Sequence, residues 1–164
     1  MPTRRFLLTN TAIGLAGLLG SSRFVAVSAA DEALQVTHTD AEWRKLLTSD
    51  QYAVLRQSAT ERPFTSPLVH EHRPGVFACA GCDLGLFSSE TKFESGTGWP
   101  SFWAPLNEQV IGATRDTTLG MIRVEVHCSR CGGHLGHVFN DGPKVTGLRY
   151  CMHGVAMTFK SAAA

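Results

Sequence analysis

The feature that most constrains how this chain can fold is a pair of Cys-x-x-Cys motifs, Cys79 to Cys82 and Cys128 to Cys131. Two intervening residues let the chain turn so that both sulfurs of a motif converge, and two motifs supply the four thiolates of a closed tetrahedral metal site. We therefore expect one structural Zn²⁺ on these four cysteines, because a closed all-sulfur shell needs no redox chemistry from its metal. Iron is the alternative ion, and redox dithiols or structural disulfides are the alternative uses of the cysteines.

Length and composition predict a single globular domain. The chain has 164 residues, of which 43% are hydrophobic and 18% charged, and its 16 glycines suit a turn-rich β protein. The formal net charge is +1, and Arg4, Arg5 and Arg23 are the only charged side chains before Asp31. The rest of the chain therefore carries more acidic than basic residues. Such a body lacks the positive surface that binds phosphate backbones, so we expect no nucleic acid partner.

Residues 1–29 are typical of an export signal and are kept out of the fold prediction. Arg4 and Arg5 precede a mildly apolar stretch, and Val27-Ser28-Ala29 offers the short side chains that a signal peptidase reads. This order resembles a twin-arginine export signal, with a general secretory signal or a short membrane anchor as the alternative. The apolar stretch is shorter than the roughly 20 residues that a transmembrane helix needs. We expect a periplasmic protein, without stable membrane association after signal removal, that forms one domain over residues 30–164.

Two short helices are expected near the start of this domain. Asp40 is a candidate N-cap for a helix over Ala41–Leu47, and Asp50 is a candidate N-cap for a helix over Gln51–Gln57. In the first helix, the spacing of the apolar residues places Trp43, Leu46 and Leu47 on one face, which we expect to be buried.

From Gly75 onward the pattern changes to short strands that are separated by turn residues. In the segment from Arg123 to Cys128, polar and apolar residues alternate, which indicates a strand with one solvent-facing side. The pattern predicts a mainly antiparallel β domain. The expected strands are Val76–Cys79, Leu86–Phe87, Val110–Ala113, Met121–Cys128, Leu135–Phe139, Leu148–Met152 and Val155–Phe159.

Cys151 is the one cysteine that the two motifs leave unassigned. If its segment is a strand, Arg149 and His153 lie on the same face, where they would favour the thiolate form. His134 and His137 lie three residues apart, a short distance upstream. Together these residues indicate nucleophilic thiol chemistry assisted by an acid. The alternative is that the cysteine is a small buried hydrophobe and that each histidine is structural.

Several segments of the chain closely resemble type B methionine sulfoxide reductases. They are Glu94–Phe102, His134–Pro143, Arg149–Cys151, Thr60–Phe64 and the two Cys-x-x-Cys motifs, which occur in the expected order. The resemblance covers roughly Trp43 to Phe159. It implies an enzyme that reduces the R epimer of methionine sulfoxide in oxidised proteins back to methionine. It also implies a β-sandwich or barrel-like domain of two antiparallel sheets with short N-terminal helices and a zinc site remote from the catalytic centre.

The resemblance assigns a role to each polar candidate. Cys151 would attack the sulfoxide sulfur and become a sulfenic acid. His137 would contact the sulfoxide oxygen and assist the proton transfer. His134, Asp141 and Arg149 would order the site and tune the thiolate.

Trp99 and Phe139 match the aromatic wall that receives the S-methyl group of the substrate, with plain core packing as the alternative. The chain departs from the family pattern at two positions. His153 stands where many members have asparagine, which keeps a hydrogen-bond donor but changes the pH dependence. Thr97 stands where many members have a resolving cysteine. No other cysteine is left for that role, so a thioredoxin-like or small-thiol reductant would reduce the sulfenic acid directly.

Two other functions compete with this interpretation. A zinc module that binds a partner without catalysis predicts that Cys151 is buried and inert. A dithiol oxidoreductase predicts that the two Cys-x-x-Cys motifs cycle between thiol and disulfide instead of holding a metal.

Overall fold

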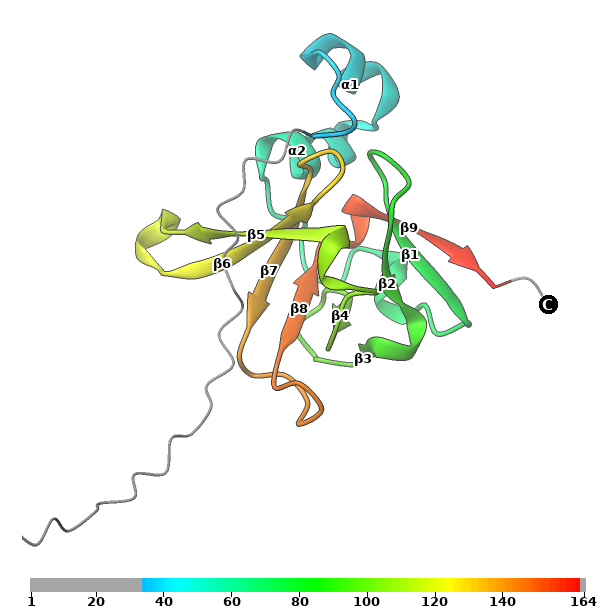
Figure 1. The fold of residues 1–164 in the computed structure, drawn as a ribbon, viewed down its shortest axis with the longest axis vertical. Coiled ribbons are helices and arrows are strands. Elements are labelled where there is room, and N and C mark those ends of the chain that lie inside the picture. The colour runs from blue at the N-terminus through cyan, green and yellow to red at the C-terminus, as the bar shows by residue number, and fades with distance from the viewer. Residues whose placement is uncertain (1–33, 163–164) are drawn as a thin grey trace, which may run out of the picture.

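The computed structural model describes residues 34–162, which fold into two sheets and two short helices (Figure 1). The predicted export signal lies outside these residues. The helices are α1 (Asp40–Leu46) and α2 (Ser49–Gln57). Within residues 34–162, no helix is long and apolar enough to cross a membrane. The expected fold class, a mainly antiparallel β domain with short helices at its N-terminal end, is confirmed.

The strands form one three-stranded and one six-stranded sheet, in which the neighbouring strands are antiparallel. The three-stranded sheet has the order β2 (Gly85–Ser88), β1 (Gly75–Cys79), β9 (Met157–Ser161). The six-stranded sheet has the order β3 (Lys92–Phe93), β4 (Ser101–Phe102), β8 (Arg149–Met152), β7 (His134–Phe139), β6 (Arg123–Cys128), β5 (Ile111–Asp116). The last strand of the fold thus returns to pair with the first.

All the expected strands are present, and the differences from expectation have local causes. β9 begins at Met157 and not at Val155, because Gly154–Ala156 forms a 3-10 helix. β5 extends to Asp116, beyond its expected end. The sequence does not reveal β3 and β4, since two residues are too few to show an alternating pattern.

The helices begin one or two residues earlier than the sequence suggests. Thr39 and Thr48 are the N-caps, and the prediction of Asp40 and Asp50 in that role is wrong. Each threonine hydroxyl accepts a hydrogen bond from the backbone N–H three residues later, and the side chain of that later residue accepts one from the threonine N–H. A cap at Asp40 or Asp50 could not form this reciprocal capping box, because the residues three positions later, Trp43 and Ala53, have no side-chain acceptor. Leu46 is 60% exposed, against expectation, because α1 ends there and only the next residue turns inward.

Four aromatic side chains join the two sheets into one core. Phe77 of β1 and Phe87 of β2 come from the small sheet, and Phe102 of β4 and Tyr150 of β8 come from the large one. The ring centroids of Phe77 and Phe102 lie 5.0 Å apart, and those of Phe87 and Phe102 lie 4.4 Å apart in a stacked pair. All four rings are almost completely buried. Truncating such a ring to alanine typically costs about 3–5 kcal/mol.

A β-bulge in β7 determines which residues share a face of the large sheet. Val126 of β6 pairs with Gly136, but the next residue of β6 pairs with His134, so β7 contains one extra residue. Without the bulge, His134 and His137 would point to opposite faces, because strand side chains alternate. With it, their ring centroids lie 5.5 Å apart on one face. Gly136 is required here: its φ is +152°, and a Cβ atom would lie 2.2 Å from the carbonyl oxygen of Cys151.

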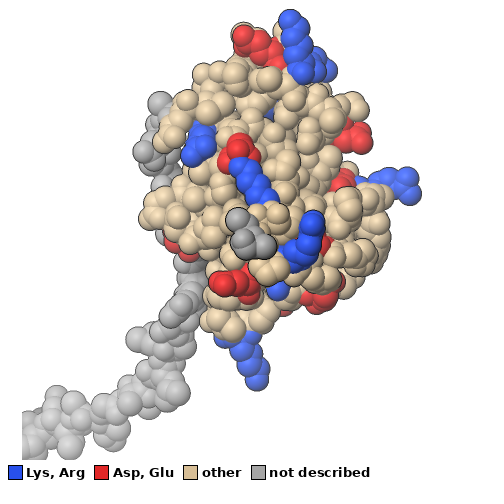
Figure 2. All heavy atoms as spheres, turned by 90° about the vertical axis from the view of Figure 1, so that its right-hand side faces the viewer, with Lys and Arg blue, Asp and Glu red and all other residues tan. Residues whose placement is uncertain are grey.

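The surface on the side of the C-terminus carries charges of both signs. Figure 2 shows basic and acidic side chains interspersed there and separated by uncharged surface. This face therefore offers no continuous basic patch, as the near-neutral composition of the chain predicts.

Candidate functional site

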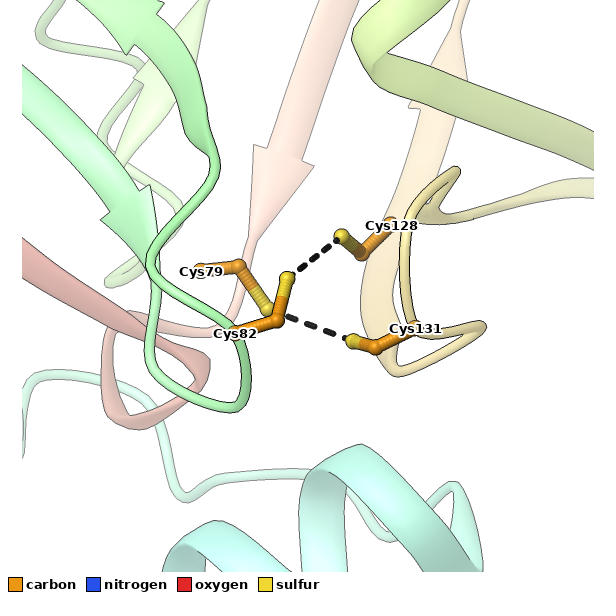
Figure 3. Close-up of side chains that lie close together, drawn as sticks. All are labelled: Cys79, Cys82, Cys128 and Cys131. Atoms are coloured by element: carbon orange, nitrogen blue, oxygen red, sulfur yellow. Dashed lines mark hydrogen bonds between the residues drawn. The ribbon is translucent and has the colours of Figure 1, made fainter. Parts of the chain in front are cut away.

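The four predicted metal ligands come together where two hairpin turns meet. The turn from Cys79 to Cys82 joins β1 to β2 in the small sheet, and the turn from Cys128 to Cys131 joins β6 to β7 in the large sheet (Figure 3). The four Sγ atoms lie within 4.8 Å of one another. The cluster therefore connects the two sheets at one end of the fold.

The spacing of these sulfurs fits one tetrahedral ion. The Sγ atoms of Cys79 and Cys131 lie 3.7 Å apart, and those of Cys82 and Cys128 lie 3.5 Å apart. Zinc–sulfur bonds of about 2.3 Å separate tetrahedral ligands by roughly 3.8 Å, whereas a disulfide brings two sulfurs to about 2.05 Å. All five cysteines of the chain are free. Hydrogen bonding to Cys128 raises the pKa of Cys79 and Cys131, so a cation would displace protons on binding.

The N-terminal helices pack directly on the metal-ligand turns. A Cβ atom at Gly133 would lie 2.9 Å from Leu55 of α2, so this glycine allows the close approach. Nη1 of Arg56 donates a hydrogen bond to the carbonyl oxygen of Cys131 at 3.0 Å. The guanidinium of Arg56 also lies 4.8 Å from the ring of Trp43 in α1. The cluster is thus joined to both helices as well as to both sheets.

Cys151 lies in the middle of the large sheet, on its other face from the core. In β8 it pairs with His137 of β7 on one side and with Ser101 of β4 on the other. Its side chain is half-buried, and its Sγ lies 3.6 Å from Oγ1 of Thr97. The hydroxyls of Thr97, Ser95 and Ser101 continue this contact as a chain, with O–O distances of 2.8 and 2.7 Å.

Arg149 is the cation that faces this sulfur. Asp141 accepts two hydrogen bonds from its guanidinium, both at 2.9 Å, and the guanidinium lies 4.4 Å from the ring of Phe139. The bonds to Asp141 raise the pKa of Arg149, and the Cys151 thiol adds to the increase. The structure thus places Arg149 and Cys151 on one face, as the strand prediction requires.

Each of the two bulge histidines is bound by a carboxylate, from β5 for His137 and from β6 for His134. Nε2 of His137 lies 2.8 Å from Asp116, which also binds Arg123 at 2.6 Å. Nδ1 of His134 lies 2.7 Å from Glu125. Burial lowers the pKa of His137, although the bond to Asp116 opposes this shift. Each carboxylate occupies one ring nitrogen and leaves the other for proton transfer.

His153 follows β8 and is only 7% exposed. Its ring centroid lies 5.6 Å from that of His134 and 6.3 Å from that of Trp99. Its Nδ1 is buried and has no hydrogen-bond partner among the described residues. Burial, with smaller contributions from His134 and His137, lowers the pKa of His153 to about 3. The ring is therefore neutral near pH 7, and it is Arg149 that supplies positive charge on the face of the thiol.

The loop over residues 60–65 joins Trp99 to the segment that follows the thiol. The backbone carbonyl of Glu61 accepts a hydrogen bond from Nε1 of Trp99 at 3.0 Å. The carboxylate of Glu61 accepts hydrogen bonds from the backbone N–H groups of Gly154 at 2.6 Å and Val155 at 3.3 Å. A cavity of about 640 Å³ lies between this loop and α2, and its lining includes Glu61 and Gly154 but not Cys151. Cys151 therefore lies outside this cavity.

Residues 47–161 match the family model of the SelR domain. The chain is 51% identical to peptide methionine sulfoxide reductase MsrB of Agrobacterium fabrum over 126 residues, which cover 77% of this chain and 93% of that protein. The MsrB protein of Methanosarcina barkeri is 53% identical over 126 residues, 77% of this chain and 89% of that protein. The MsrB protein of Pseudomonas putida is 53% identical over 126 residues, 77% of this chain and 95% of that protein. The chain belongs to the MsrB family.

The structure brings together all the site residues that the sequence suggests for an MsrB protein. Cys151 pairs with His137, and side-chain contacts connect His137 to the other candidates, which are His134, His153, Trp99, Phe139, Arg149 and Asp141. The four metal cysteines form a separate cluster. Sequence reasoning misses Asp116, Glu125 and Glu61. Glu125 lies on the predicted polar side of its strand, and Glu61 lies inside a segment that resembles the family. Asp116 has no comparable signal, since its contact with His137 depends on the pairing of β5 with β6.

We expect replacement of a cluster cysteine to remove the metal and destabilise the fold. Cys79→Ser or Cys128→Ser leaves three thiolates, and metal binding in such sites is part of the folding free energy. Metal analysis should fall from about one ion per chain to a small fraction of that. The melting temperature should fall by roughly 10 °C or more. Cys151→Ser is the matched control and should keep both the metal content and the melting temperature of the wild type. A metal-free cluster variant that melts like the wild type would contradict the structural role of the metal.

The low pKa of His153 should make the fold less stable in acid. Below the usual histidine pKa of about 6.5 the unfolded chain binds a proton that the folded chain does not, so stability falls by up to about 1.4 kcal/mol per pH unit until pH 3. His153→Asn should abolish this loss. Urea unfolding at pH 7 and pH 4.5 should show the variant losing roughly 2–3 kcal/mol less than the wild type. His72→Asn, at an exposed histidine, should lose as much stability between the two pH values as the wild type. An equal loss of stability in all three proteins would contradict the low pKa of His153.

Proposed function

We propose that the chain is a peptide-methionine (R)-S-oxide reductase, which converts methionine (R)-sulfoxide residues of oxidised proteins back to methionine. The observation that carries this proposal is the half-buried Cys151 thiol between the Arg149 cation and the paired His137. A thiol beside a fixed cation and a titratable acid is suited to nucleophilic attack with proton transfer. The MsrB relatives, about half identical over most of this chain, carry the same activity in their names.

In the proposed reaction the thiolate of Cys151 attacks the sulfoxide sulfur. The sulfoxide oxygen takes up one proton and passes to the cysteine sulfur, so that methionine leaves and the cysteine becomes a sulfenic acid. The substrate sulfur gains two electrons and the cysteine sulfur loses two. Two external thiols then reduce the sulfenic acid back to the thiol. The two thiols are released as one disulfide, and the sulfenic oxygen leaves as water.

His137 is the proposed proton donor to the sulfoxide oxygen. Asp116 occupies its Nε2, which leaves Nδ1 for the substrate. Because burial lowers the pKa of His137, its protonated form is a stronger acid than a free imidazolium. His134, held in the same way by Glu125, supports the position of its neighbour.

Trp99 and Phe139 are the proposed wall for the S-methyl group. Sulfur and methyl groups pack favourably against aromatic edges and faces. The rings of Trp99 and His153 form a T-shaped pair, and the ring centroid of Phe139 lies 6.4 Å from that of His137. Both rings therefore border the polar groups that would bind the sulfoxide oxygen.

An external reductant is required because no second thiol lies beside the nucleophile. Thr97, at 3.6 Å, occupies the position where a resolving cysteine would form the first disulfide. The other four cysteines form the metal cluster. A thioredoxin-like protein or a small thiol would therefore reduce the sulfenic acid directly.

We also propose that residues 1–29 direct export by the twin-arginine route, with a periplasmic destination. This route carries folded proteins, so the cluster could take up Zn²⁺ before the chain meets an oxidising compartment. The metal would then protect the four thiols from disulfide formation.

The stoichiometry of a reaction without reductant tests the proposed function. Excess peptide methionine (R)-sulfoxide should give about one methionine per chain and then stop, because each chain has one nucleophile. Mass spectrometry should find a dimedone adduct of the sulfenic acid on Cys151.

Cys151→Ser is the control for that experiment and should produce no methionine, because the nearly isosteric hydroxyl is a poor nucleophile toward sulfur. Turnover by this variant would show that the nucleophile is another group. A disulfide between Cys151 and a cluster cysteine would contradict the proposed route of recycling.

A further inference from the structure

Phe64 is an aromatic side chain that is both exposed and held in an unfavourable backbone conformation. It is 67% exposed, and its φ of +63° lies in the left-handed region that bulky residues rarely adopt. The backbone at this residue is therefore strained, and burial of the ring does not offset the strain. Strained residues that persist in this way tend to lie at ligand-binding sites.

Several hydrogen bonds hold the backbone of Phe64 and its loop in place. Its backbone N–H donates to the carbonyl oxygen of Gly98 at 2.7 Å. The hydroxyl of Thr65 donates to the carbonyl oxygen of Arg62 at 2.7 Å and closes the loop around it. The bonds of Glu61 to Trp99 and to the segment after Cys151 fix the start of the same loop. The backbone that carries this exposed ring is thus fixed.

This ring borders the proposed substrate site. A Cβ atom at Gly98 would lie 2.8 Å from two ring atoms of Phe64, so the ring lies against this glycine. Gly98 stands between Thr97, which contacts the Cys151 sulfur at 3.6 Å, and Trp99, the proposed wall for the S-methyl group. The Phe64 ring therefore packs on the residue that connects the neighbour of the Cys151 sulfur to the proposed aromatic wall.

We propose that Phe64 binds the residue that neighbours methionine sulfoxide in a polypeptide, and so determines a preference for peptide over free methionine sulfoxide. The inference rests on the proposed function. A rigid aromatic side chain offers contact area at a low entropic cost. A peptide brings an amide and a neighbouring side chain to this ring. The free amino acid brings a charged amino group and a charged carboxylate, which gain little from an aromatic surface.

The test compares kcat/KM for two substrates with a small dithiol as the reductant, so that docking of a protein reductant plays no part. The substrates are an N-acetylated, C-amidated peptide with leucine on both sides of methionine (R)-sulfoxide, and free L-methionine (R)-sulfoxide. Phe64→Ala should lower kcat/KM for the peptide by about tenfold, mainly through KM, and change that for the free amino acid by less than about twofold.

Three further variants distinguish the contribution of the ring from that of the backbone conformation. Phe64→Gly tolerates the positive φ but lacks the ring, so it should lose the peptide preference as the alanine variant does. Phe64→Tyr should retain it. Ile122→Ala removes another exposed apolar side chain, 74% exposed, and should leave both substrates unchanged.

Two results would overturn the inference: an equal loss for both substrates in Phe64→Gly, or no loss for either. A wild-type protein that reduces neither substrate would instead overturn the proposed function and this inference with it. The two failures are therefore distinguishable by the wild-type rates alone.

Discussion

The convergence of four cysteine sulfurs on one point connects the two sheets at one end of the molecule. One pair lies in the turn between β1 and β2, the other in the turn between β6 and β7, and α2 packs on the second turn through Leu55 and Arg56. β7 starts three residues after Cys131 and carries both His134 and His137, of which His137 pairs with Cys151. A metal ion at this cluster would therefore fix the strand on which the reactive face is built, while remaining on the core side of the sheet.

The reactive face itself depends on one backbone irregularity. The bulge at Gly136 turns His134 to the same side as His137, and the absence of a side chain at Gly136 lets β8 approach with Cys151. Opposite charges then order the polar groups: Asp141 holds Arg149, and carboxylates from β5 and β6 hold the histidines. Backbone geometry places the groups, and electrostatic contacts set their orientation and protonation.

The sequence predicts the metal cluster and the thiol because their signals are local: two fixed cysteine spacings, and a cysteine flanked by arginine and histidine. The resemblance to the family supplies the two-sheet fold and the aromatic wall. Local patterns do not reveal β3 and β4, which exist only through pairing, or Asp116, whose partner is 21 residues away. The capping boxes of Thr39 and Thr48 do have a local sequence signal. The prediction missed it because aspartates, which are also preferred N-caps, lie close by.

We infer that the four cluster sulfurs hold the fold while the Cys151 sulfur performs the chemistry. Metal release during a single turnover tests it directly. A metal-loaded sample is mixed with excess peptide methionine (R)-sulfoxide without reductant, and a chromogenic chelator records free metal while chromatography records methionine. The claim predicts methionine formation with the metal retained. Release of about one metal ion for each methionine formed would contradict it, because the cluster thiolates would then be part of the redox chemistry.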